Sequence, residues 1–322
     1  TPMRILVTGG AGFIGSHLSE RLLSEGHQLT VADDLNDFYP PAEKRDNLSL
    51  IRRKGEFRFA ELDIRNQERV FELVREARPE AIIHLAARAG VRPSLEHPFL
   101  YVQVNVGGTL TLLEAARRSG VPKFIFASSS SVYGAANRIP FRESDLELRP
   151  ISPYAATKLA GEQLCYTYSR LYGIETVCLR FFTVYGPRQR PDLAIRKFAG
   201  RMLDGMPVPI YGTGEAARDY TYVDDTVTGI VAALRHSTPF DVFNLGNSSP
   251  VRLDELIEAL ERALGVKAKL DRQPEQPGDV PVTFADISKA REILGYEPST
   301  HHWKGLGLMA AWLRTSLMAA AP

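Results

Sequence analysis

Short hydrophobic runs alternate with longer amphipathic stretches along the first 180 residues of the chain. Short apolar runs are typical of buried strands, and apolar positions three or four residues apart are typical of helices. The pattern predicts a helix at 13–25, further helices between the later strands, and strands at 5–7, 28–32, 57–62, 81–85, 123–127 and 174–179. Such alternation implies parallel strands joined by right-handed crossovers, so we expect an α/β fold with a Rossmann-type doubly wound parallel sheet.

The composition changes after about residue 182, where prolines and glycines crowd positions 187–214. We therefore expect a smaller C-terminal substrate-binding lobe with many loops. A helical pattern at 224–235 and a strand-like run at 242–245 are expected to return to the sheet, and further helices are expected at 253–264 and 304–318. The expected division gives residues 1–180 and 220–246 to the sheet domain, and residues 181–219 and 247–322 to the lobe.

The overall composition excludes several classes of protein. The 322 residues are 44% hydrophobic and 24% charged, as in ordinary globular proteins, and the net charge of +1 gives no general attraction to nucleic acid or membranes. Cys165 and Cys178 have no ligand-like spacing, so we expect free buried thiols and no metal site. From the free thiols we expect a reducing, cytoplasmic compartment, and no apolar run is long enough to span a bilayer.

Gly9, Gly12 and Gly15 form a G-x-x-G-x-x-G pattern between the first predicted strand and helix. So tight a turn favours glycine, and a pyrophosphate can approach it only where no side chain intervenes. The helix that follows, beginning with Phe13 and Ile14, offers free N–H groups to the phosphates. A plain cluster of loop glycines is the alternative, but the position at the start of a βαβ unit favours a dinucleotide site.

Acidic residues end the second and third predicted strands. Asp33 is placed to accept a hydrogen bond from the adenine ribose, and a carboxylate there disfavours a 2′-phosphate, so we expect NAD rather than NADP. Asp63, followed by Ile64, is a candidate contact for the adenine. An equally weighted alternative is that Asp63 caps the next helix.

Tyr154 and Lys158 are four residues apart on a predicted helix, which puts both side chains on one face. A free tyrosine, with a pKa of about 10, is a poor base at neutral pH. A neighbouring ammonium group would lower that pKa and let the tyrosine take a proton from a hydroxyl. The pair alone is weak evidence, but it follows the serines at 128–131, where the fifth strand ends and a ligand of such a sheet is expected.

Together these features resemble the extended short-chain dehydrogenase/reductase family. The turn at 8–15, the Tyr154/Lys158 pair and the stretch at 218–225 carry the resemblance, which covers nearly the whole chain. It implies that NAD stays bound through the cycle, with a nucleotide sugar in the second lobe. It also implies a homodimer that pairs the helices near 101–117 and 153–172.

Further stretches, at 34–39, 86–92, 128–134, 180–187 and 276–281, are similar to the branch of the family that epimerises UDP-linked uronic acids. The resemblance implies reversible, NAD-dependent conversion of UDP-glucuronic acid to UDP-galacturonic acid through a 4-keto intermediate. It gives catalytic roles to Tyr154, Lys158 and Ser129. The implied cofactor contacts are Gly9, Gly12, Phe13, Ile14, Gly15, Asp33, Asp63, Ile64, Leu85, Ala86, Ala87, Arg88, Asn105, Tyr154 and Lys158. The implied substrate contacts are Arg92, Ser129, Ser130, Ser131, Tyr154, Thr183, Arg190, Tyr211, Arg218 and Asp279.

One arginine is a candidate partner for the carboxylate of a uronic acid. The resemblance places Arg190 where a guanidinium binds the C6 carboxylate, which needs donors of this kind. The alternative is a solvated loop cluster of Arg188, Arg190 and Arg196. For Arg92, a substrate contact and a structural salt bridge are equally weighted interpretations. The chain departs from many sugar epimerases at Gln276, where they carry an arginine, so one phosphate contact is in doubt.

Four rival functions stay open. Related decarboxylases carry an acid where this chain has Ser131, and related 4,6-dehydratases carry Asp-Glu where it has Ser130-Ser131, so both lack an evident catalyst here. Epimerisation of neutral UDP-glucose or UDP-N-acetylglucosamine would leave Arg190 without a clear partner. A non-catalytic NAD-binding scaffold usually lacks the tyrosine or lysine.

Overall fold

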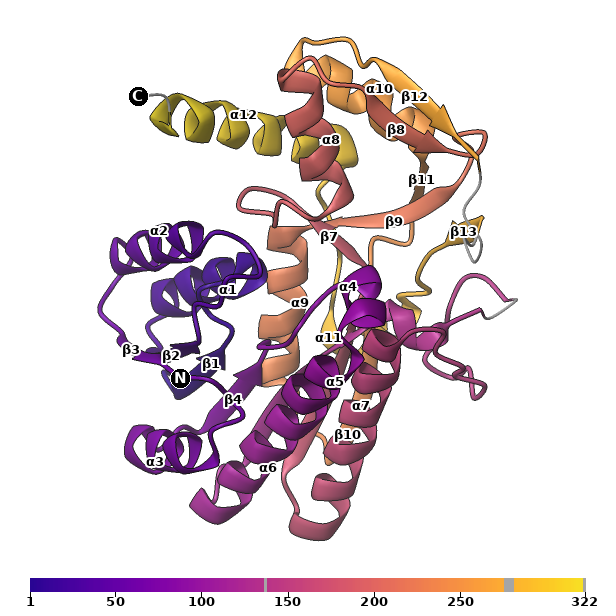
Figure 1. Cartoon of the computed structure of the whole chain (residues 1–322). Helices are drawn as coiled ribbons and strands as arrows, with labels where there is room; N and C mark the ends of the chain where they lie inside the picture. The colour runs from indigo at the N-terminus through magenta and orange to yellow at the C-terminus, as the bar shows by residue number, and fades with distance from the viewer. Residues whose placement is uncertain (136–137, 275–280, 321–322) are drawn as a thin grey trace.

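A seven-stranded parallel sheet forms the larger part of the molecule, with a smaller lobe at one end (Figure 1). The computed structural model describes residues 1–135, 138–274 and 281–320. The strand order is β10-β6-β5-β4-β1-β2-β3, which confirms the predicted doubly wound fold. The strands are β1 (Arg4–Thr8), β2 (Gln28–Asp33), β3 (Arg58–Glu61), β4 (Ala81–His84), β5 (Lys123–Ser129), β6 (Glu175–Phe181) and β10 (Phe240–Leu245).

Alternate residues of the central strands enter two separate hydrophobic cores. In β1, Ile5 and Val7 belong to one core and Leu6 to the other. Successive side chains of a strand point to opposite faces, so both faces of this sheet are covered, as parallel sheets require. The first core includes α1 (Phe13–Ser24), α2 (Pro41–Arg52) and α9 (Val223–Arg235), and the second includes α3 (Gln67–Ala77), α6 (Gly108–Ser119) and α7 (Pro153–Tyr172).

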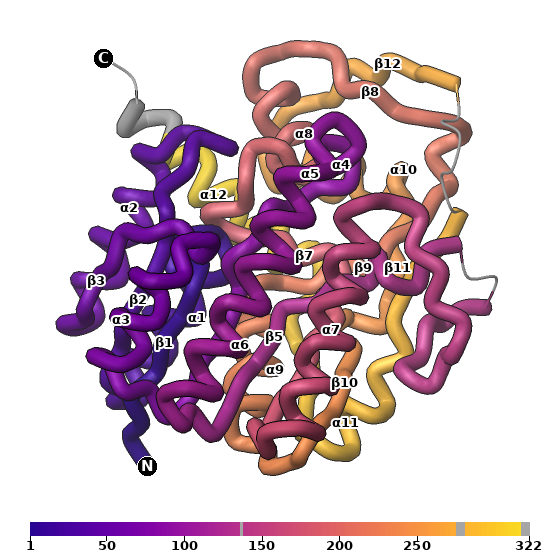
Figure 2. Tube along the Cα trace, turned by 60° about the horizontal axis from the view of Figure 1, so that its bottom comes forward, coloured from indigo at the N-terminus to yellow at the C-terminus, as the bar shows by residue number. Residues whose placement is uncertain are grey.

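The second lobe is built from short strands that the hydrophobic pattern did not predict. β7 (Thr183–Tyr185), β9 (Ala217–Tyr222), β11 (Pro250–Arg252) and β13 (Val282–Thr283) form one sheet, and β8 (Val208–Tyr211) pairs with β12 (Leu270–Gln273). The expected helix at 253–264 is α10 (Leu253–Leu264), which packs with α8 (Ala194–Leu203) and α12 (His302–Ala320). Figure 2 shows β8, β12 and α8 gathered at the end of the molecule away from β10.

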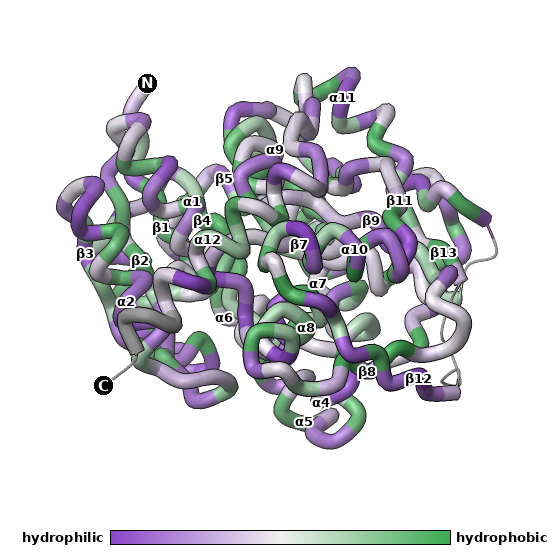
Figure 3. Tube along the Cα trace, turned by 90° about the horizontal axis from the view of Figure 1, so that it is seen from above, coloured by the Kyte–Doolittle hydropathy of each residue, from purple (hydrophilic) through white to green (hydrophobic). Residues whose placement is uncertain are grey.

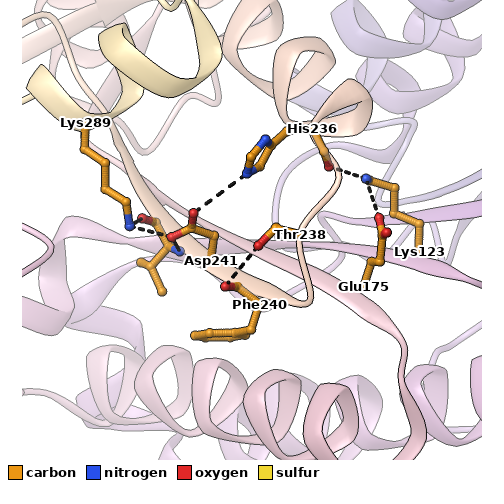
Figure 4. A network of polar contacts seen from close by, with 8 residues as sticks. Lys123, Glu175, His236, Thr238, Phe240, Asp241 and Lys289 are labelled. Atoms are coloured by element: carbon orange, nitrogen blue, oxygen red, sulfur yellow. Dashed lines mark hydrogen bonds and ion pairs between the residues drawn. The ribbon is translucent and has the colours of Figure 1, made fainter.

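The chain returns from the lobe to the sheet, as the sequence predicts. Strand β10 pairs in parallel with β6, from Phe240 opposite Thr176 to Leu245 opposite Phe181. A polar network fixes this edge (Figure 4): Lys123 binds Glu175 at 3.1 Å and donates to the carbonyl oxygen of His236. In the same network Asp241 pairs with Lys289 of α11 (Ser288–Leu294).

Short helices precede the long helices on the second face. α4 (Val91–Glu96), α5 (Pro98–Tyr101) and a π-helical segment η1 (Val102–Gly107) lead into α6, and a 3-10 turn η2 (Ser130–Tyr133) follows β5. Cys165 and Cys178 are free and buried, as predicted. Hydrophobic and polar segments intermingle along the whole trace (Figure 3). Among the described residues, no helix has the length and apolar character needed to cross a bilayer.

Candidate active site

The glycine turn leaves no room for side chains. Gly9 has a φ of +69°, and a Cβ atom added there would lie 2.7 Å from the backbone nitrogen of Ala86. A Cβ added at Gly15 would lie 2.1 Å from the carbonyl oxygen of Gly9. No side chain caps α1, whose N-cap is Gly12, so its first N–H groups remain available to a ligand. Gly9, Gly12, Phe13, Ile14 and Gly15 line one pocket at the carboxyl ends of the strands.

Asp33 lies at the end of β2 in the wall of this pocket. Its carboxylate accepts hydrogen bonds from the N–H of Ala11 at 3.1 Å and of Leu35 at 3.0 Å. Burial raises the pKa of Asp33, and these two backbone hydrogen bonds oppose that rise. Asp33 therefore also fixes the glycine turn, a structural role that the sequence does not reveal.

Asp63 and Ile64 line the pocket beside Leu62. Asp63 pairs with Arg65 at 2.5 Å, and this hydrogen bond lowers the pKa of the Asp63 carboxyl. The alternative that Asp63 caps the next helix is wrong, because the N-cap of α3 is Asn66, whose side chain accepts from the N–H of Arg69.

The segment after β4 forms the opposite wall, through Leu85, Ala86, Ala87 and Arg88. Asn105 is not among the lining residues. It lies buried in η1 behind this wall, where its side chain accepts from the N–H of Arg88 at 2.7 Å and donates to the carbonyl oxygen of Arg88 and to Thr157 Oγ1 at 3.0 Å each. Asn105 thus positions the wall and α7 from outside the pocket.

Helix α7 carries the predicted catalytic pair into the same pocket. The Lys158 ammonium donates to the carbonyl oxygen of Ala127 at 2.8 Å, and burial lowers the pKa of Lys158 to about 8. Burial raises the pKa of Tyr154, whereas a hydrogen bond with Ser129 and the charge of Arg190 lower it. Ser129 and Arg190 thus act on the Tyr154 hydroxyl, and the Lys158 ammonium lies 5.9 Å from the Tyr154 ring centroid. The expectation that the ammonium lowers the pKa of Tyr154 is not confirmed, because the groups that lower it are Ser129 and Arg190.

The serines at the end of β5 have separate tasks. Ser128 donates to the Glu162 carboxylate at 2.6 Å, and Ser129 Oγ accepts from the N–H of Ser131 at 3.1 Å. Ser130 and Ser131 lie half-buried in η2. The residues that line the pocket include Ser128 but not Ser129, Ser130 or Ser131.

Arg188 and Arg190, in the loop after β7, and Arg196, on α8, have different partners. Arg188 pairs with Glu20 at 2.6 Å, and Arg196 pairs with Glu43 at 2.7 Å. Arg190 lines the pocket and pairs with Asp192 at 2.9 Å, and its guanidinium lies 5.8 Å from the ring centroid of Phe38. The expectation that a neutral sugar would leave Arg190 without a clear partner is therefore wrong. The alternative of a single solvated arginine cluster is therefore wrong.

The other predicted substrate contacts lie outside the lining of this pocket. Arg92, on α4, stacks over the Tyr211 ring at 5.9 Å and so links α4 to β8. Thr183 is exposed at the start of β7, and Arg218 on β9 donates to the carbonyl oxygen of Ala217 at 2.9 Å. Asp279 and Gln276 lie outside the described residues.

The segment directly after Asp33 belongs to the site, although its residue types alone did not predict a role there. The pocket is also lined by Asp34, Asn36, Phe38, Tyr39 and Lys44. The Lys44 ammonium donates to the carbonyl oxygen of Asn36 at 2.8 Å and lies 4.8 Å from the Tyr39 ring centroid. Their position directly after the carboxyl end of β2 was the available signal, since ligands of such sheets bind there.

The chain is similar to known proteins over nearly its whole length. The sequence profile of the NAD dependent epimerase/dehydratase family matches residues 5–246. A UDP-glucuronate 4-epimerase from Thermodesulfobacterium geofontis is 43% identical over 97% of this chain and 96% of its own length.

Two crystal structures are similar over 97% of this chain and 99% of their own. The UDP-glucuronic acid 4-epimerase from Bacillus cereus, in complex with UDP-glucuronic acid and NAD, has 38% identity and a TM-score of 0.90. The UDP-glucose 4-epimerase from Thermotoga maritima, with UDP-glucose, has 36% identity and the same TM-score. Similarity of the fold alone therefore does not separate acidic from neutral sugars.

Proposed function

The chain belongs to the NAD dependent epimerase/dehydratase family, and from that premise we propose that it interconverts UDP-glucuronic acid and UDP-galacturonic acid by epimerisation at C4. The observation that carries the proposal is the convergence of Arg190 with Tyr154 and Lys158 in one pocket. A guanidinium matches a carboxylate in charge and in shape, and the C6 group of a uronic acid is such a carboxylate.

The residues present fit NAD. The cradle at Gly9 and Gly15, which a Cβ would fill, lets a pyrophosphate approach the start of α1, and Asp33 lies where the adenine ribose is expected. When bound, NAD supplies the acceptor and donor of the hydride at C4 of the sugar. We assign the cofactor to residues 1–180 with 220–246, and the nucleotide sugar to 181–219 with 247–322.

Proton transfer falls to Tyr154. Its phenolate takes the proton of the 4-hydroxyl, and Ser129 hydrogen-bonds the phenolic oxygen and lowers its pKa. Lys158 donates to the carbonyl oxygen of Ala127, and its ammonium lies 5.9 Å from the ring centroid of Tyr154, so in our proposal it adds positive charge beside the ring. The 4-keto sugar rotates within the site. Tyr154 returns the proton to the C4 oxygen when C4 is reduced from the opposite face of the sugar.

The 4-keto uronic acid is a β-keto acid and can lose carbon dioxide. In our proposal Arg190, which lines the pocket, holds the carboxylate. Positions 129–131 carry serines rather than an acid. In our proposal Thr183 and Arg218 contact the diphosphate, Asp279 contacts the uridine ribose, and Arg92 and Tyr211 close over the sugar. These assignments rest on the family resemblance.

We further propose a homodimer that pairs α6 and α7 of each subunit. Its support is a row of exposed apolar side chains on α5, η1 and α6, at Phe99, Val102 and Leu110. Large apolar patches on a surface typically mark an interface. We place the enzyme in the cytoplasm, on the support of its two free thiols.

The test is conversion of defined UDP-sugars by the purified protein, resolved by anion-exchange chromatography. We expect UDP-galacturonic acid from UDP-glucuronic acid and little conversion of UDP-glucose. Conversion of UDP-glucose alone would make the enzyme a neutral-sugar epimerase, and release of a UDP-pentose would make it a decarboxylase. Arg190→Gln should abolish the preference for the acid, whereas the matched Arg188→Gln, whose arginine faces Glu20, should keep it.

A further inference from the structure

A tight turn brings a carboxylate of the protein itself against Arg190. The Leu193 N–H donates to the carbonyl oxygen of Arg190 at 3.2 Å, with Pro191 at the second position of the turn, where proline is favoured. The next residue is Asp192. Arg190 Nε donates to Asp192 Oδ1 and Arg190 Nη2 donates to Asp192 Oδ2, each at 2.9 Å. The guanidinium proposed to bind the substrate carboxylate is therefore already bound by a carboxylate in two-pronged geometry.

Asp192 acts on a ligand only through Arg190. Arg190 lines the pocket together with Tyr154, whereas Asp192 is not among the lining residues. The Arg190 side chain is about 20% exposed, so its charge is largely withdrawn from water. A largely buried cation without a partner is costly, and the Asp192 carboxylate offsets that cost when no substrate acid is present.

The Arg190–Asp192 ion pair affects the binding of acidic and neutral sugars differently. A substrate carboxylate has to displace Asp192 from the Nε–Nη2 edge or bind beside it against like-charge repulsion, so Asp192 weakens acid binding. A neutral sugar meets an ion pair whose charges cancel instead of a bare cation, so Asp192 reduces the penalty for lacking a carboxylate.

We propose that Asp192 is a specificity-determining residue that limits how strongly the site prefers acidic over neutral UDP-sugars. The inference rests on the proposed function, because it takes Arg190 as the partner of the sugar carboxylate. Asp192 is a positioning residue, because it acts through Arg190. It holds the guanidinium in place between turnovers and so sets the selectivity of the site between acidic and neutral sugars.

The experiment compares binding of UDP-glucuronic acid and UDP-glucose to Asp192→Asn by calorimetry. Both ligands carry the same diphosphate, so their affinity ratio cancels the effect of the lost negative charge on the diphosphate. Measuring in a Tyr154→Phe background prevents turnover. We expect the preference for the acid to rise about tenfold in Asp192→Asn, as for the loss of one competing charge contact, and to stay at the parent value in Asp192→Glu.

Glu20→Gln is the matched control, because it removes the carboxylate partner of Arg188 in the same loop. It should change both affinities by the same factor, as any general loosening of the loop would. An unchanged or lower acid preference in Asp192→Asn overturns the inference. A wild-type protein that fails to convert UDP-glucuronic acid overturns the proposed function instead, so the two failures are distinguishable.

Discussion

The Glu162 carboxylate and the Arg180 guanidinium form a two-pronged ion pair beneath the catalytic residues. Arg180 Nε and Nη2 donate to the two carboxylate oxygens of Glu162 at 2.9 and 2.8 Å, and the two side chains are only 4% and 3% exposed. Tyr154, Lys158 and Glu162 follow one another at four-residue intervals along α7 and so share one face. The pair therefore ties the catalytic helix to β6.

Breaking this pair should destabilise the fold strongly. Glu162→Gln leaves the buried Arg180 cation without a charged partner, and we expect a loss of about 3–5 kcal/mol in the free energy of unfolding, measured in urea. Glu258→Gln removes the exposed partner of Arg262 and should cost at most about 1 kcal/mol. Equal losses in the two variants would show that burial does not set the strength of the Glu162–Arg180 pair.

Removing the Tyr154 hydroxyl should separate chemistry from binding. We expect Tyr154→Phe to lower kcat for UDP-glucuronic acid by about 100- to 10,000-fold, because the proton acceptor is lost. The Kd of the same ligand, measured by calorimetry, should change little. Tyr168→Phe, on the same helix but bonded to Glu114, is the control and should retain activity. A Tyr154→Phe enzyme with normal turnover would refute the mechanism.

The pH dependence of kcat should report the contact between Ser129 and Tyr154. Burial raises the pKa of Tyr154 and the Ser129 hydrogen bond lowers it, so Ser129→Ala should raise that pKa. Since the phenolate is the active form, kcat rises with pH through this pKa. The rising limb should therefore move to higher pH in Ser129→Ala, and a limb that stays in place or moves to lower pH contradicts the assignment.

Acid should destabilise the protein partly through His84. This buried side chain binds Thr8 Oγ1 at 2.7 Å and Thr109 Oγ1 at 2.9 Å, and burial, with a smaller effect of Lys158, lowers its pKa to about 3. The unfolded state then binds more protons than the folded state between about pH 6.5 and pH 3. The stability that the neutral His84 side chain contributes is fully present above the pKa of histidine in the unfolded state, and it is lost as the pH falls toward the folded-state pKa of about 3.

From this residue alone we expect about 2 kcal/mol less stability at about pH 5 than at neutral pH. His84→Gln should show a weaker pH dependence of unfolding, and His97→Gln, at an exposed position, should behave as the wild type. An identical pH dependence in His84→Gln would exclude this role.

The proposed dimer can be tested on the exposed apolar row. Phe99 on α5 is 83% exposed, Val102 on η1 is 51% exposed and Leu110 on α6 is 39% exposed. Charged side chains in an apolar interface oppose association, so Val102→Glu with Leu110→Glu should give a monomer by light scattering. Leu146→Glu, at another exposed apolar position, should leave the mass unchanged. A wild-type monomer would refute the dimer.

Parts of the fold that depend on local sequence patterns could be predicted, and parts that depend on contacts between distant segments could not. The parallel sheet could be predicted because each of its central strands is buried on both faces and is therefore an apolar run. The lobe strands β11 and β13 have three and two residues and pair with β9 far along the chain, so no local periodicity marks them.

Prediction of the site from the sequence was limited in the same way. Gly9, Tyr154 and Lys158 are recognisable by spacing, and the structure brings them into one pocket. The contact from Ala11 to Asp33 and the position of Asn105 behind the pocket wall depend on how separate strands and helices meet. Arg190 and Asp192 are two residues apart, yet only the turn between them reveals that they bind each other.

The return of β10 to the sheet has a consequence for how the chain folds. Because β10 is an edge strand that follows the first part of the second lobe, the sheet is incomplete until residues beyond 240 have been synthesised. A fragment ending near Phe181 would expose the edge of β6, a ready template for pairing with another chain. The sheet is therefore completed only after the chain has passed through the first part of the lobe, and a chain cut before Phe240 should associate through the open edge of β6.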